Sequence, residues 1–205
     1  SVVNKKGGIP PGEVENPFLK LLDLTREELA PAKELFLAES AKGDDVQAVC
    51  DFCELVFGLV PAAHHVAWLT EILENKRVVV VAPPESAKTT IISIVLMAWW
   101  IGKYPWTTNL IVSAGEDLAS KIAHTVADTI EKNPKYRMVF PKVVPAKAGG
   151  MWSRDGYDVV DEGMVASGEW LKKTAAKKDP TLSNGGVGSA SVNGKRVTGL
   201  LIGDD

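Results

Sequence analysis

The sequence of 205 residues lacks several features that would by themselves assign it to a class of protein, such as secreted, membrane or nucleic-acid-binding. It has only two cysteines, too few for the disulfide framework of a secreted domain, which favours a reducing compartment. No apolar run approaches the roughly 20 residues that span a bilayer, and the N-terminus carries no secretory signal pattern. Basic residues are not in excess either, because 23 Lys and Arg face 26 Asp and Glu, for a formal net charge of −3. A chain that only wraps nucleic acid should be more basic, so any DNA contact is expected to be local or shared among subunits.

The composition that is present is typical of a globular protein. Hydrophobic residues make up 45% and charged residues 24% of the chain, enough apolar content to bury a core. Residues 1–24 are rich in glycine and proline and are predicted to form a flexible arm. Residues 25–75 are predicted to form a helical N-terminal layer, because apolar residues follow helical spacing over 46–56 and 62–74.

From residue 76 the pattern changes to alternating strands and helices. The β-branched run Arg77–Ala82 predicts a strand buried on both faces, and 88–103 predicts a helix. Residues 109–114 repeat the strand pattern and 115–132 the helical one, before the stop at Asn133-Pro134. Strand, helix, strand, helix is typical of parallel sheets with right-handed crossovers. Residues 76–205 are therefore predicted to form an α/β core, a central, mostly parallel sheet flanked by helices.

Finer expectations follow for the rest of this core. The 115–132 helix is predicted to bury one stripe of side chains: Leu118, Ile122, Val126 and Ile130. Residues 135–156 are predicted to be a loop. Short extended segments are expected at 157–160, 168–171, 188–192 and 200–202.

One segment between the first strand and its helix carries a chemical pattern. Over Ala82–Thr89 the phosphate-binding pattern G-x-x-x-x-G-K-[ST] fits with alanine, at Ala82 and Ala87, in both glycine positions. Such a loop wraps phosphates with backbone N–H groups, while Lys88 reaches the outer phosphates and Thr89 ligates Mg²⁺. The predicted ATP-binding residues are Pro84, Glu85, Ser86, Ala87, Lys88, Thr89 and Thr90. The two alanines weaken the match, since alanine is less permissive than glycine, and a turn that merely begins a helix stays open.

A second element supplies the acids that such a loop needs. The apolar strand 200–202 is followed by Gly203 and the pair Asp204-Asp205, as in a Walker B element. Asp204 would hold Mg²⁺, and Asp205 would act as general base on the attacking water. Alone, the pair is better explained as two surface acids. Together with the Lys88 loop, in the expected order, it predicts a P-loop NTPase.

The chain then resembles a family, the N-terminal ATPase domain of the large terminase subunit of tailed bacteriophages. The resemblance covers about residues 60–205 and rests on an ordered set of short motifs. They are Ala63-His64-His65, Pro83–Thr90, Ser113-Ala114-Gly115-Glu116, Asn133-Pro134, Phe140-Pro141, Trp152-Ser153, Pro180-Thr181-Leu182, Asn193-Gly194-Lys195-Arg196 and Asp204-Asp205. Two positions depart from it: Pro84 stands where terminases often carry arginine, and Asp205 where many carry glutamate.

The resemblance implies an ATPase that drives double-stranded DNA into a procapsid in the cytoplasm of the host cell. Its implied cofactors are ATP and Mg²⁺, and its implied partners are the portal protein, the small terminase subunit and copies of itself in a ring. Arg196 resembles the arginine that some terminases supply to the next subunit, with Arg154 second; a solvated surface role stays open for both. The sequence ends after the Asp-Asp pair, so we expect no nuclease activity, and a second polypeptide or a missing nuclease domain would complete the machine.

Other interpretations remain. The chain could be another P-loop DNA translocase of helicase type, or a truncated nucleotide-binding or assembly module without turnover. His64 and His65 either border an adenine pocket or lie on a helix face without a ligand. Cys50 and Cys53 have C-x-x-C spacing, but the expectation is a pair of core thiols. A cluster of lysines is expected to be a solvated face rather than a DNA contact: Lys172, Lys173, Lys177 and Lys178.

Overall fold

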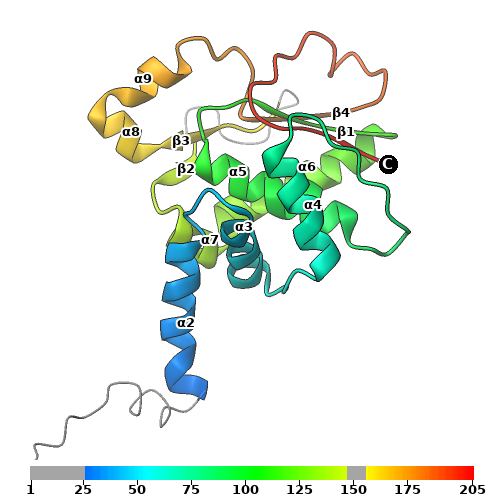
Figure 1. The fold of residues 1–205 in the computed structure, drawn as a ribbon. Helices are drawn as coiled ribbons and strands as arrows, with labels where there is room; N and C mark the ends of the chain where they lie inside the picture. The colour runs from blue at the N-terminus through cyan, green and yellow to red at the C-terminus, as the bar shows by residue number, and fades with distance from the viewer. Residues whose placement is uncertain (1–25, 147–155) are drawn as a thin grey trace, which may run out of the picture. The chain divides into compact units, whose positions relative to one another are not determined.

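The computed structural model describes residues 26–146 and 156–205. The chain divides into two units, residues 1–34 and 35–205. In the first unit the described part is the beginning of helix α2 (Arg26–Ser40), and the predicted arm lies outside the described residues. The second unit contains every other described helix and strand (Figure 1).

Helices occupy the N-terminal part of the second unit, as predicted. Helix α3 (Val46–Phe52) continues into a π-helical turn, η1 (Cys53–Phe57), and α4 (Ala63–Glu74) follows. The Asp45 carboxylate caps α3 by accepting the Ala48 N–H at 2.9 Å. Gly58 ends η1 in the left-handed conformation, with φ at 67°, that glycine adopts most easily.

Three parallel strands form the central sheet. Strand β1 (Asn109–Ser113) lies between β4 (Leu182–Gly186) and β5 (Leu201–Asp204) (Figure 1). Ser113, the last residue of β1, pairs with Gly186 on one side and Asp204 on the other. The carboxyl ends of all three strands therefore meet at one edge of the sheet. The expected α/β architecture, a parallel sheet flanked by helices, is confirmed.

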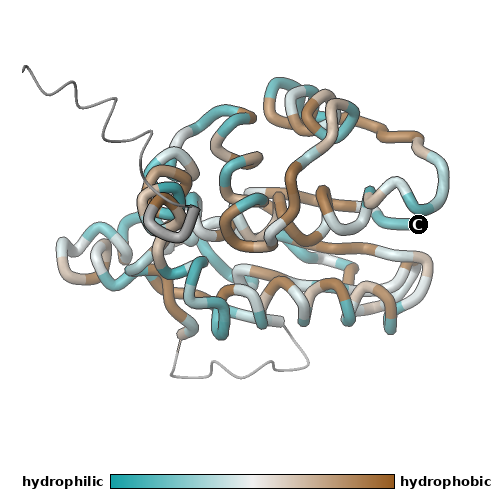
Figure 2. Tube along the Cα trace, turned by 90° about the horizontal axis from the view of Figure 1, so that it is seen from below, coloured by the Kyte–Doolittle hydropathy of each residue, from teal (hydrophilic) through white to brown (hydrophobic). Residues whose placement is uncertain are grey.

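Two helical segments pack against this sheet. The predicted 88–103 helix is present as η2 (Thr89–Leu96), a π-helical segment, followed by α5 (Met97–Lys103). Helix α6 (Glu116–Lys132) contacts β1 and β4. Polar and apolar residues alternate along the helices in Figure 2, as expected where a helix buries one face.

The buried stripe of α6 differs from the prediction at one end. Ile122, Val126 and Ile130 are buried as expected, but Leu118 is exposed and Ala119 takes the buried position. Successive residues of an α-helix are about 100° apart around its axis. Leu118 therefore lies at the margin of the buried stripe, about 40° from Ile122 but about 100° from Ala119.

The predicted strand at Arg77–Ala82 is wrong. The segment has no strand assignment, and the side chains of Val79 and Val81 are 88% and 90% exposed. Only Val80 packs against the core. β-Branched residues favour a strand where a neighbouring strand supplies hydrogen bonds and a surface to pack on, and within the described residues no strand pairs with this segment.

Strand β4 was not predicted, because its sequence Leu-Ser-Asn-Gly-Gly has little β propensity. Its glycines explain its position. A Cβ on Gly186 would stand 3.0 Å from the backbone nitrogen of Glu116, so glycine lets β4 approach the start of α6 closely. Tertiary packing thus overrides the local preference of the segment.

Other short segments also differ from the predictions. The expected extended segment at 168–171 lies in α9 (Glu169–Thr174), which follows α8 (Glu162–Ser167), and 188–192 is built of turns. The expected loop at 135–156 begins within α7 (Pro134–Val139) and contains β2 (Val143–Pro145), which pairs antiparallel with β3 (Val159–Asp161). Asn133 caps α7 by accepting the Lys135 N–H at 2.9 Å, so the expected stop also begins a new helix.

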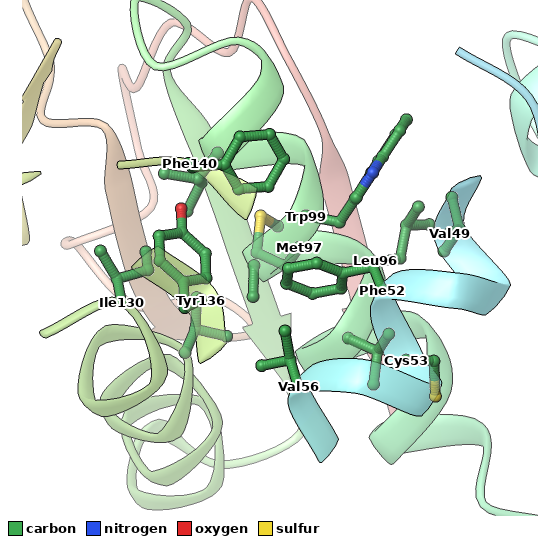
Figure 3. Close-up of a cluster of buried hydrophobic side chains, with 14 of the residues drawn as sticks. Val49, Phe52, Cys53, Val56, Leu96, Met97, Trp99, Ile130, Tyr136 and Phe140 are labelled. Carbon is green, nitrogen blue, oxygen red and sulfur yellow. The ribbon is translucent and has the colours of Figure 1, made fainter. Parts of the chain in front are cut away.

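The helices and the sheet share one hydrophobic core, which runs from Leu37 to Ile202. Figure 3 shows the rings of Phe52, Tyr136 and Phe140 near one another at its centre. Their centroids lie 5.5–6.0 Å apart in edge-on or tilted contacts, geometries that aromatic pairs prefer. Trp99 is buried beside them and donates its indole N–H to the Ala41 carbonyl at 2.8 Å.

Candidate functional site

Segments more than a hundred residues apart meet at the carboxyl edge of the sheet. The Thr89 hydroxyl donates to Asp204 Oδ1 at 3.0 Å, and the Ser93 hydroxyl donates to Asp204 Oδ2 at 2.5 Å. The Lys88 ammonium group forms an ion pair with Asp205. The two predicted elements, residues 83–90 (called here the 83–90 loop) and the Asp-Asp pair, thus form one cluster.

The local fold explains this meeting. Asp204 is the last residue of β5 and lies beside Ser113 at the carboxyl edge. Thr89 and Ser93 are four residues apart at the start of η2, so both hydroxyls can face the same strand end. Asp204 is only 5% exposed, and a buried carboxylate is costly unless donors satisfy both oxygens. The two hydroxyls supply those donors.

The 83–90 loop has an unusual backbone. Glu85 and Ala87 are the only non-glycine residues with positive φ in the part of the chain that the structure describes, at 64° and 58°. L-residues adopt this left-handed conformation at a cost of about 1–2 kcal/mol each. Loops that alternate between right- and left-handed backbone direct successive N–H groups into one concavity, which suits anions. Glu85 is exposed, which leaves its own carboxylate in solvent.

A histidine from α4 holds this loop. His65 Nε2 lies 2.9 Å from the Ser86 carbonyl oxygen, and the Ala62 N–H donates to His65 Nδ1 at 3.1 Å. Ala62 is the N-cap of α4, so the ring joins the first turn of that helix to the loop. This contact favours neither sequence hypothesis for His65, because its partner is the protein backbone.

The ion pair changes the chemistry of Asp205. The hydrogen bond from Lys88 holds the pKa of the Asp205 carboxyl below its usual range. Lys88 is 24% exposed and Asp205 85% exposed, so the pair lies at the mouth of the cluster while Asp204 lies beneath. A carboxylate paired in this way remains ionised and is a weak proton acceptor until the lysine leaves.

The other predicted loop residues line the same segment. Pro84 and Ala87 are exposed, whereas Ser86 and Thr90 are half-buried. Ser93 was not among the predicted site residues. Its signal in the sequence was its spacing, one helical turn after Thr89, which places a second hydroxyl on the same helix face.

Arg196 lies away from this cluster in its own chain. Its carbonyl accepts a hydrogen bond from the Thr108 hydroxyl at 2.5 Å, and its N–H donates to Asp179 at 2.9 Å. Thr108 precedes β1, so Arg196 lies at the amino end of the sheet, opposite Asp204. The predicted action on a neighbouring subunit stays a prediction. Arg154 lies outside the described residues.

The remaining candidate residues are the two cysteines and the lysine cluster, and their contacts are with the protein itself. Burial raises the pKa of the Cys53 thiol to about 12, and Cys50 is half-buried. Among residues 26–146 and 156–205 no group of three or more His, Cys, Asp or Glu side chains could hold a metal ion. In the lysine cluster, Lys177 pairs with Asp158 at 2.9 Å, and Lys173 lies 4.6 Å from the Trp106 ring centre.

Comparison with known proteins gives no assignment. No protein-family model, no curated protein and no solved structure matches the chain. Within the described ranges, no helix has the length and apolar character that crossing a membrane requires.

Proposed function

We propose that this chain is the ATPase domain of a viral DNA-packaging motor of the terminase type, with a P-loop NTPase core. One observation carries the proposal: Lys88 and Thr89 of the 83–90 loop contact Asp205 and Asp204 at the carboxyl edge of a parallel sheet. Ligands of open α/β folds bind at this edge. The combination of lysine, hydroxyl and two carboxylates is the set that phosphoryl transfer requires.

The donor chemistry of this cluster fits Mg²⁺. Thr89, Ser93 and Asp204 offer hydroxyl and carboxylate oxygens, the hard ligands that Mg²⁺ prefers, and Mg²⁺ sites commonly use few protein ligands beside substrate phosphates. Thr89 and Asp204 would hold the ion, with Ser93 orienting the carboxylate. When bound, Mg²⁺ would neutralise charge on the phosphate oxygens.

The chain's own groups have separate roles in the proposed reaction. The backbone N–H groups between Pro84 and Lys88 would bind the phosphates of ATP. Lys88 would exchange Asp205 for the β- and γ-phosphates, because these oxygens carry more negative charge than one carboxylate. Asp205, released from the lysine, would regain basicity and orient the attacking water. Arg196 of a neighbouring copy would stabilise the charge that develops on the transferred group.

In this proposal the ATPase works in a ring of copies that binds double-stranded DNA. The portal protein and the small terminase subunit would be its other partners on the procapsid, in the host cytoplasm. A separate or C-terminal nuclease would cut the DNA. A helicase-like translocase is the alternative motor, and stimulation by single-stranded DNA would favour it.

A second candidate is a nucleotide-binding or assembly module without turnover. It is favoured by the segment before the loop, where Val79 and Val81 lie exposed and unpaired with any described strand. The ion pair between Lys88 and Asp205 also favours this candidate, because it occupies both the cation and the general base that turnover would require.

The test is Mg²⁺-dependent ATP binding and hydrolysis across a range of protein concentrations. Lys88→Ala should weaken binding at least about 10-fold and abolish turnover, because it removes the cation that faces the outer phosphates. Lys121→Ala is the matched control, since it removes an exposed lysine on α6.

Three results are distinguishable. Turnover that rises with protein concentration and is stimulated by double-stranded DNA supports the motor. Binding without turnover supports the module. A folded wild-type chain that binds no nucleotide overturns both.

A further inference from the structure

We propose that His65 is a positioning residue that sets the shape of the 83–90 loop and thereby its affinity for nucleotide; this inference rests on the proposed function. His65 comes from α4, 21 residues before its partner Ser86. Among the described residues it hydrogen-bonds to the loop backbone and to none of the five charged or hydroxyl side chains of the cluster. Its effect would therefore pass through the loop.

The loop needs such support. Ser86 lies between the two left-handed residues, Glu85 and Ala87. Strained conformations persist only where the surrounding structure holds them. The Ser86 carbonyl is the loop atom that His65 holds, at 2.9 Å, so one hydrogen bond acts at the centre of the strained turn.

The ring of His65 is itself fixed. Its Nδ1 accepts the Ala62 N–H, which assigns the ring proton to Nε2 and makes Nε2 the donor to Ser86. His64 and Trp68 stack edge-on against the ring, with centroids 4.0 Å and 5.2 Å away. Both the tautomer and the plane of the ring are thus determined by α4.

Two substitutions separate the two hydrogen bonds of His65. Glutamine can place its amide N–H where Nε2 lies and keep the Ser86 contact. Asparagine can accept from Ala62 with its carboxamide oxygen but is too short to reach Ser86. His124→Asn is the matched control, on an exposed histidine of α6.

The first measurement is the dissociation constant of a fluorescent, non-hydrolysable ATP analogue with Mg²⁺. We expect His65→Asn to weaken binding about 3- to 10-fold, the range of one hydrogen bond, and His65→Gln to change it less than about 2-fold. His124→Asn should bind as the wild type does. Equal affinity of the wild type and His65→Asn would overturn the proposal, as would a folded His65→Gln that has lost binding.

The second measurement needs no nucleotide. Amide hydrogen exchange of residues 85–88 should be faster in His65→Asn than in the wild type and unchanged in His65→Gln. If the wild type binds no nucleotide, the proposed function fails, and this exchange measurement alone decides whether His65 holds the loop.

A double-mutant cycle distinguishes positioning from general stability. Ala87→Gly relieves the left-handed strain, so it should recover part of the binding lost in His65→Asn, and its effect on affinity should be larger in that variant than in the wild type. Additive effects of the two substitutions would overturn the link between His65 and the turn. Should His65→Asn fail to fold, His65→Leu, which has no N–H to donate to the Ser86 carbonyl, alone and with Ala87→Gly provides the same comparison.

Discussion

At the scale of single residues, Ala87 adopts a conformation that glycine would adopt at lower cost. Its φ of 58° lies in the left-handed region, and it occupies the second glycine position of the phosphate-binding pattern. The mismatch that weakened the sequence pattern is thus a residue forced into glycine geometry. Residues so strained often lie at functional sites.

Ala87→Gly should therefore stabilise the fold, by up to about 1 kcal/mol. Relief of about 1–2 kcal/mol of left-handed strain exceeds the extra chain entropy of glycine in the unfolded state, about 0.4–1 kcal/mol. Urea unfolding measures the difference. Ala67→Gly, on the exposed face of α4, should have the opposite sign, with a loss of about 1 kcal/mol. If the Ala87→Gly variant were less stable than the wild type, the backbone of Ala87 would not be strained.

The two cysteines should differ in reactivity. Iodoacetamide at pH 8 should modify half-buried Cys50 slowly and leave Cys53 unmodified, because burial raises the pKa of Cys53 to about 12 and the thiolate is the nucleophile. Peptide mass spectrometry measures both, and guanidinium chloride should make both reactive. Modification of Cys53 in the folded chain at the unfolded rate would contradict its burial.

The same pKa has a consequence for stability. The unfolded thiol ionises near its ordinary value of 9.0, well below the folded value of about 12. Below pH 9 this thiol leaves the free energy of unfolding unchanged. Between pH 9 and 12 that free energy falls by about 1.4 kcal/mol per pH unit, because the unfolded thiol loses its proton first. Cys53→Ala should flatten this part of the stability profile, as urea unfolding between pH 8 and 11 would show.

At the scale of elements, the close approach of α5 to Phe140 depends on a glycine. A Cβ on Gly102 would lie 2.2 Å from Phe140 Cδ2, a distance at which the ring must move. Phe140 also packs on Phe52 and Tyr136, so the movement would disturb the aromatic centre of the core.

Gly102→Ala should consequently cost about 1–3 kcal/mol, the usual penalty of overpacking. Thermal unfolding should show the loss, and adding Phe140→Leu should recover part of it. Gly115→Ala is the control, since nothing lies within 4 Å of a Cβ there and its φ is ordinary. Equal midpoints for Gly102→Ala and the wild type would mean that the ring has room to move.

The elements that could be predicted are those whose buried residues follow a recognisable pattern within their own stretch of sequence. β1 has an apolar centre at 110–112, α6 repeats its apolar residues at helical spacing, and β5 ends at Asp204, the first of the two acids that mark it. β4 and the 77–82 segment could not be predicted, because partners far away in the sequence determine them. β4 lies where it does because Gly186 permits close contact with the start of α6. Val79, by contrast, has high β propensity, but no described strand pairs with its segment.

The same division holds for the site. Lys88, Thr89, Asp204 and Asp205 could be predicted together, because their order along the chain follows from how strands and loops alternate in an α/β fold. His65 could not, because its role depends on where α4 places its first turn. Ser93 is an intermediate case. Its spacing of four residues from Thr89 is evident in the sequence, but the sequence does not show that the end of β5 faces it.

At the scale of the whole molecule, the helical layer and the sheet share one core. Residues from Leu37 to Ile202 belong to a single cluster, and residues 35–205 form one unit. The helices of residues 46–74 should then unfold together with the sheet rather than before it.

Urea unfolding should give coincident transitions by tryptophan fluorescence and far-ultraviolet circular dichroism. Val49→Ala in α3 should shift both curves equally, by about 1–3 kcal/mol, because it removes packing from the shared core. Leu171→Ala, on an exposed side chain of α9, is the control. An early loss of helical signal alone would show that the layer folds independently of the sheet.

The exposed valines before the 83–90 loop also affect how the purified chain would behave in concentrated solution. Val79 and Val81 are exposed in a segment of high β propensity, and β5 has no described strand on its far side. Unpaired backbone of this kind is a template on which another chain can add a strand. Solubility and storage life should therefore be limited by strand-to-strand aggregation that begins here, well before the core unfolds.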